Sequence, residues 1–102
     1  MNQLNILSNF FLASLNDQRI GPVHISMYAA LLKLWQEQAY KKTFNITRKR
    51  LMPLCKIYGL ATYHDKIKEL HNFGYINYEP SYNPYEGSQV SFKENSIEGD
   101  EK

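Results

Sequence analysis

The first forty positions carry apolar residues at the spacing of two helices. Intervals of three and four residues between apolar side chains in residues 5–16 predict an amphipathic helix with a wide apolar face. A second helix is predicted over residues 24–40, where Leu32 and Trp35 belong to one apolar repeat. Together these helices carry more apolar surface than a small domain needs for its own core. We therefore expect a homodimer that forms through residues 5–40.

Shorter elements follow in the middle of the chain. Residues 43–46 alternate like a short edge strand. Thr47 is a suitable N-cap for a third helix over residues 48–56, which Pro53 should kink or shorten. A tight turn then leads to a fourth helix over residues 61–73. The residues expected to face the core in these two helices are Leu51, Leu54, Cys55 or Ile57, Tyr63, Ile67 and Leu70.

The last third of the chain is predicted to be extended. Residues 75–79 alternate like a half-buried strand, residues 80–87 are rich in turn formers, and residues 88–92 form a returning strand. The polar and acidic residues 93–102 are expected to be a disordered tail. The predicted fold is thus mainly α with a small β-hairpin, in one domain over residues 1–92.

The composition fits one small globular domain. The chain has 102 residues, of which 43 % are hydrophobic and 22 % are charged. Its single cysteine, Cys55, cannot form an internal disulfide and is expected to be a small buried hydrophobe. No apolar run reaches the ~18–20 residues that a membrane helix needs, and the first residues lack the basic region of a signal peptide. We therefore expect a cytoplasmic protein that does not bind a membrane.

Charge is distributed unevenly, although the net charge is only +2. Residues 41–56 contain six basic residues and no acid, whereas residues 77–102 contain six acids and two lysines. A concentrated basic segment indicates a polyanionic partner more strongly than the total charge does.

The basic segment coincides with two helices joined by a tight turn. Residues 48–56 and 61–73 have the lengths and the connection of a helix-turn-helix, whose second helix enters the major groove of duplex DNA. Because the apolar residues of that second helix face inward, its opposite side is left to read bases. The expected base-reading residues are Thr62, His64, Asp65 and Lys68.

Other positions suit contacts with the DNA backbone. The residues expected to bind phosphates are Lys41, Lys42, Arg48, Lys49 and Arg50. The hairpin would form a wing, and its loop contains Tyr82, Asn83 and Tyr85. This loop contains Glu86 and no basic residue, which departs from the basic wing tips that commonly enter the minor groove.

The segment around the fourth helix carries a resemblance to a known family. Residues 59–70, Gly-Leu-Ala-Thr-Tyr-His-Asp-Lys-Ile-Lys-Glu-Leu, followed by Phe-Gly-Tyr-Ile at residues 73–76, resemble the recognition helix and the start of the wing in winged helix-turn-helix regulators. MarR-like and GntR-like repressors and phage or plasmid replication-initiation domains share this pattern. With residues 80–88 included, the segment is similar to small helix-turn-helix proteins encoded on bacterial conjugative transposons. The resemblance covers about residues 43–92.

This resemblance implies a function as well as a fold. It implies sequence-specific binding of double-stranded DNA, either in transcriptional regulation or in an accessory role in excision, transfer or replication of a mobile element. An alternative from another class is a protein-interaction module in a replication or transfer complex, with the same face buried against a partner. Asp65, the acidic tail and the wing loop without a basic residue favour this alternative.

No pattern in the chain points to catalysis. His64 and His71 are seven residues apart and could share a helix face, but a third metal ligand is missing beside them. The sequence contains no glycine-rich phosphate loop and no Cys–His arrangement for nucleophilic chemistry. We therefore expect neither an enzyme nor a protein that holds a metal or a cofactor.

Overall fold

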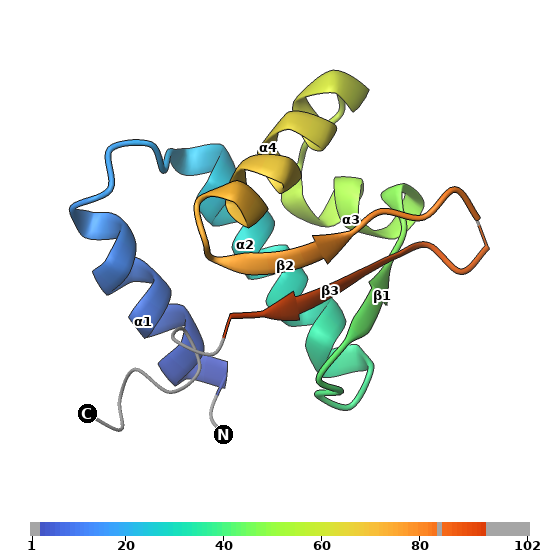
Figure 1. The fold of residues 1–102 in the computed structure, drawn as a ribbon, viewed down its shortest axis with the longest axis horizontal. Helices are drawn as coiled ribbons and strands as arrows, with labels where there is room; N and C mark the ends of the chain where they lie inside the picture. The colour runs from blue at the N-terminus through green and yellow to red at the C-terminus, as the bar shows by residue number, and fades with distance from the viewer. Residues whose placement is uncertain (1–2, 84, 94–102) are drawn as a thin grey trace.

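The computed structural model describes residues 3–83 and 85–93, and arranges them as four helices and one small antiparallel sheet (Figure 1). The mainly helical class predicted from the sequence is therefore confirmed. In chain order the elements are α1 (Gln3–Leu15), α2 (Pro22–Glu37), β1 (Phe44–Ile46), α3 (Arg48–Cys55), α4 (Leu60–Asn72), β2 (Ile76–Glu79) and β3 (Ser88–Phe92). Along the longest axis, α1 lies at one end and the loop between β2 and β3 lies at the other (Figure 1).

Helix α2 supplies much of the core. Its buried residues are His24, Met27, Tyr28, Ala30, Leu31, Leu32, Leu34 and Trp35. The helix ends at Glu37, three residues before its predicted end, because Ala39 and Tyr40 take left-handed backbone conformations with φ of 62° and 61°. The Trp35 indole donates to the carbonyl oxygen of Lys41 at 2.9 Å and so holds the turn that leads to β1.

The three strands form a sheet in the order β1-β3-β2, with both pairs antiparallel. Strands β2 and β3 are the predicted hairpin, in which Ile76 lies opposite Phe92. Strand β1 is at an edge, as its pattern predicts. The side-chain amide of Gln38 donates to the carbonyl oxygen of Asn45 at 2.7 Å and accepts from its amide at 3.0 Å. These bonds occupy the outer side of β1, where another strand could otherwise pair.

The start of α3 follows the local chemistry of its sequence. The hydroxyl of Thr47 accepts from the amide of Arg50 at 3.3 Å, which confirms the predicted N-cap. The helix continues for only two residues after Pro53 and ends at Cys55. The helix thus accommodates the proline, and it ends where Lys56 takes a left-handed conformation.

One residue of α3 was placed wrongly from the sequence. Leu54 is 42 % exposed, whereas it was expected to face the core. In this short helix Leu51 and Cys55, four residues apart, make up the buried side. The left-handed conformation of Lys56 (φ 61°) then turns the chain so that Ile57 is buried as well. No inward position remains for Leu54.

Helix α1 buries only one side of its apolar surface. Phe10 lies in the core and stacks on Tyr28 with 3.9 Å between ring centroids. Leu12 and Leu15 are 67 % and 77 % exposed, and Phe11 is exposed too. The wide apolar face predicted for this helix is therefore only partly buried by the described residues.

A cluster around Asp17 joins the α1–α2 connection to Tyr75, which follows α4. The Asp17 carboxylate accepts from the Tyr75 hydroxyl at 2.7 Å and from the Arg19 guanidinium at 2.8 Å. The Arg19 hydrogen bond, and after it the Tyr75 hydrogen bond, hold the pKa of Asp17 well below its usual range. Burial, assisted by the Asp17 contact, raises the pKa of Tyr75 to about 12.

A second polar contact joins the start of α2 to α4. The Nδ1 atom of the buried His24 accepts from the amide of Gly21 at 3.0 Å, so its Nε2 carries the ring proton and donates to Glu69 at 2.7 Å. This bond is the main reason that the pKa of Glu69 is lowered. His24 therefore connects two helices, and the Asp17 cluster and this bond together fix the orientation of α4.

Two sequence predictions concern the membrane and the tail. Across residues 3–83 and 85–93 the helices lack the length and hydropathy needed to cross a bilayer. The disorder predicted for residues 93–102 falls outside the described residues, except for Lys93.

Candidate nucleic-acid interface

An open groove of about 700 Å³ lies between α4, the start of α3 and the β2–β3 hairpin. It brings together residues as far apart in the sequence as Ile46 and Ser88, because the hairpin packs beside α4 and extends past the start of α3 (Figure 1). The residues that line it are Ile46, Thr47, Arg48, Lys49, Tyr63, His64, Lys68, Tyr78, Pro80, Ser81, Tyr82, Asn83, Gly87 and Ser88.

The charge of this groove is positive. Arg48, Lys49 and Lys68 line it, and none of them forms an ion pair with a carboxylate in the part of the chain that the structure describes. The lining includes neither Asp nor Glu. By contrast, Arg19 and Lys66 elsewhere on the surface are each paired with an acid. Cations that lack an internal partner are free to bind an external anion.

The four residues expected to read bases all lie on α4, but they divide between two sides of the helix. Burial of Tyr63, Ile67 and Leu70 turns the opposite side of α4 outward, as predicted. His64 and Lys68, one helical turn apart, line the groove. Thr62 and Asp65 are exposed and lie outside its lining. The open side of α4 is therefore not covered by the core of this chain.

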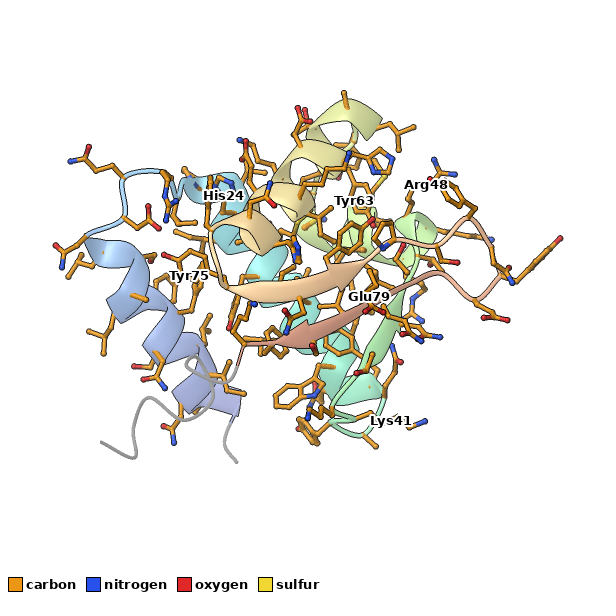
Figure 2. The ribbon with its side chains drawn as sticks, viewed as in Figure 1. His24, Lys41, Arg48, Tyr63, Tyr75 and Glu79 are labelled. Atoms are coloured by element: carbon orange, nitrogen blue, oxygen red, sulfur yellow. The ribbon has the colours of Figure 1, made fainter. Side chains whose placement is uncertain are left out.

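The five residues expected to bind phosphates also separate. Arg48 and Lys49 stand in the first turn of α3, beside α4 and the hairpin. The guanidinium of Arg50 instead pairs with Glu37 at the end of α2, and Lys33 lies 4.0 Å from the same carboxylate group. Lys41 and Lys42 lie before β1, at the opposite end of this strand from Arg48 (Figure 2).

The loop of the hairpin is held by its own hydrogen bonds. Asn83 Oδ1 accepts from the amides of Tyr85 at 2.9 Å and Glu86 at 3.3 Å, and its carbonyl oxygen accepts from Gly87 at 2.9 Å. Gly87 has φ of 75°, and a Cβ at this position would overlap the carbonyl oxygen of Ile46. A glycine is therefore needed where the hairpin approaches β1.

Several residues of the groove were not predicted from the sequence. Tyr78, Ser81 and Ser88 line it and offer hydroxyl groups beside the cations. The alternation of β2 could have indicated Tyr78, because this residue shares a face with the buried Ile76. The serines carried no such signal. Tyr63 is also part of the lining, and burial raises the pKa of its phenol, which therefore remains a neutral hydrogen-bonding group.

His24 and His71 have structural partners, and the histidines of the described chain do not gather into a metal site. Within residues 3–83 and 85–93, no three His, Cys, Asp or Glu residues come together in a way that could hold a metal ion. His71 instead accepts from the amide of Tyr78 through Nδ1 at 3.1 Å. Comparisons with protein-family models, with curated proteins and with solved structures found no match.

Proposed function

We propose that this chain is a winged helix protein that binds double-stranded DNA in a sequence-specific manner. The observation that carries the proposal is the groove beside the open side of α4, with three cations that have no carboxylate partner among the described residues. The order helix, strand, helix, helix, hairpin from α2 onward and the strand order β1-β3-β2 support a winged helix. In this proposal α4 enters the major groove and the β2–β3 hairpin is the wing.

Each side of α4 has a role in this proposal. Lys68 reaches guanine or a phosphate, and His64 donates to or accepts from a base edge. Asp65, at the exposed crest of the helix, accepts from a cytosine amino group, since the same carboxylate would be repelled by a phosphate. Arg48 and Lys49 bind phosphates and set the register of the complex, because such contacts carry no sequence information.

Selection of bound sequences from a random duplex library tests this function. We expect an enriched motif in which positions under α4 are specified. The role in the cell that best suits such binding is transcriptional control or an accessory step in the movement of a mobile element. If the selected pool stays random in sequence, sequence-specific binding is refuted.

We also propose that the protein binds DNA as a homodimer through α1. Ser8, Phe11, Leu12 and Leu15 share one face of this helix, with the spacing i, i+3, i+4 and i+7, and all four are exposed. Helix α1 contains no charged residue, so two copies of it can approach without repulsion between like charges. A two-fold symmetric dimer matches a DNA site with dyad symmetry.

Sedimentation equilibrium tests the dimer directly. Replacing Leu12 and Leu15 by Glu places like charges at the proposed contact, and we expect a monomer. The matched control is Leu54→Glu, which puts a charge on an exposed leucine of α3, far along the chain from α1. A parent protein that sediments as a monomer, or a doubly substituted protein that remains a dimer, contradicts the proposed contact.

A protein-interaction module remains the second candidate, for a specific reason. Leu54, Tyr58 and Leu60 are exposed within and around the turn that joins α3 to α4, where an apolar surface suits a protein partner. The two functions differ in their dependence on salt. DNA binding through several phosphates weakens steeply as salt rises, whereas binding through an apolar patch changes little.

A further inference from the structure

The two tyrosines at the end of the hairpin are the most exposed aromatic residues described. Tyr82 and Tyr85 have relative exposures of 102 % and 93 %. Burial of an aromatic ring is favourable, so two almost fully exposed rings within one loop point to an external contact. The loop holds no cation, and Glu86 follows Tyr85 directly, so attraction to phosphate does not account for this surface.

Hydrogen bonds restrain the backbone on both sides of these rings. Besides the three bonds that Asn83 accepts, its amide donates to the Ser81 hydroxyl at 3.1 Å, and the amide of Ser81 donates to the Ser88 hydroxyl at 3.1 Å. These bonds restrain the described residues of the loop, so less conformational freedom is lost there on binding.

The position of the loop indicates which partner it meets. Tyr82 lines the groove whose cations are Arg48, Lys49 and Lys68. A nucleic acid bound in this groove by its phosphates would bring its bases near the end of the hairpin. Bases of an intact duplex are stacked on each other, and their separation costs energy. Unpaired bases offer free π-faces, on which aromatic side chains stack without regard to sequence.

We propose that Tyr82 and Tyr85 stack on unpaired bases, so that the protein prefers a duplex that carries a single-stranded end over an intact duplex. This inference rests on the proposed DNA binding and names its substrate class: DNA with a junction between double and single strands. The groove holds the duplex part, and the hairpin loop holds the first unpaired bases.

Three labelled DNA molecules with the same duplex sequence test the inference by fluorescence anisotropy. One has blunt ends, one has a short single-stranded tail, and one has a tail of abasic nucleotides, which keeps the phosphates and lacks the bases. We expect the normal tail to bind about 5- to 150-fold more tightly per stacked base than the abasic tail. Equal affinities for the normal and the abasic tail would overturn the inference.

Two variants connect this preference to the tyrosines. Tyr82→Ala with Tyr85→Ala should bring the ratio of affinities for the two tailed molecules close to one, whereas Tyr82→Phe with Tyr85→Phe should keep it. Because both rings are exposed, circular dichroism is expected to show folded protein in each case. A ratio that survives in the alanine variant overturns the assignment to these residues.

The failures of the two proposals can be told apart. If the blunt duplex is bound and the normal tail adds nothing, only the junction preference is refuted. If the normal tail is bound and the blunt duplex is not, duplex binding is refuted and base stacking stands. If none of the three molecules is bound, both proposals fall.

Discussion

Removal of the two cations at the start of α3 should change how DNA binding responds to salt. Arg48 and Lys49 line the groove and have no carboxylate partner in the described chain, whereas Arg50, directly after them, pairs with Glu37. The informative comparison is therefore Arg48→Ala with Lys49→Ala against Arg50→Ala. The sequence predicted phosphate binding for all three of these neighbouring residues. In the structure only Arg48 and Lys49 line the groove, whereas Arg50 pairs with Glu37.

The size of the effect follows from counterion release. Each phosphate that a side chain neutralises contributes about 0.9 to the slope of log affinity against log salt. If Arg48 and Lys49 each bind one phosphate, the double variant should lose about 1.8 of this slope per protomer. Between 50 and 200 mM salt, the parent would then lose about 12-fold more affinity than the variant for each protomer that contacts the DNA. Arg50→Ala should change the slope by much less, because the Glu37 carboxylate already neutralises this guanidinium.

Anisotropy titrations of a labelled duplex at four or more salt concentrations measure these slopes. The absolute affinity alone is not sufficient, because a variant that unfolds also binds weakly, and thermal unfolding is recorded in parallel. Equal slopes for the parent and the double variant would show that the groove does not bind phosphate. A larger slope change in Arg50→Ala than in the double variant would show that the phosphates lie along α2 instead.

Three further predictions address specificity, pH and the hairpin. His64→Ala should relax the base preference at particular positions by about 1–3 kcal/mol, and a repeated sequence selection measures this; an unchanged motif would show that His64 does not read bases. The pKa of Asp17 is lowered in the folded state, so its carboxylate contributes to the free energy of unfolding. This contribution is complete above the ordinary pKa of about 3.9 and is lost as the pH falls through the pKa of the folded state. Asp17→Asn should therefore flatten the fall in stability from about pH 5 to about pH 2 in urea unfolding, and an unaltered pH profile would contradict the role of this cluster. Gly87→Ala should destabilise the protein more than Gly74→Ala, by thermal unfolding, because both glycines have positive φ but only Gly87 faces a backbone oxygen; equal losses would mean that the approach to Ile46 is not restrictive.

The order of the elements could be predicted because it depends on local patterns. The helical spacing of apolar residues predicted α1, α2 and α4, and the N-cap residue Thr47 predicted the start of α3. The alternation of apolar and polar residues predicted the strands. The error at Leu54 arose because neighbouring residues compete for one inward position. Leu54 has the same local pattern as its buried neighbours, but Ile57 fills the remaining inward position after the chain turns at Lys56.

The candidate groove was only partly predictable because it depends on contacts between residues that are distant in the sequence. Residues of α4 could be assigned an outward side, because Tyr63, Ile67 and Leu70 define the inward side. The separation of Arg48 from Arg50 depends on the position of Glu37, which lies 13 residues earlier on another helix. The spacing of residues along the sequence does not predict a contact of this kind. The contribution of Ser81 and Ser88 depends likewise on how the hairpin packs beside α4.

The contacts around α1 connect the proposed dimer to the proposed DNA interface. Phe10 stacks on Tyr28 and meets the edge of Tyr75 with 5.2 Å between ring centroids, and the Tyr75 hydroxyl binds Asp17. Because Tyr75 lies three residues after the end of α4, these contacts join α1 and the connection after it to the segment that leaves α4. In a dimer formed through α1, the same contacts would determine the distance and angle between the two α4 helices. If the dimer is right, the spacing of half-sites in the selected DNA would therefore change with Tyr75→Phe. If each chain binds alone, the selected DNA would contain no pair of half-sites at a fixed spacing.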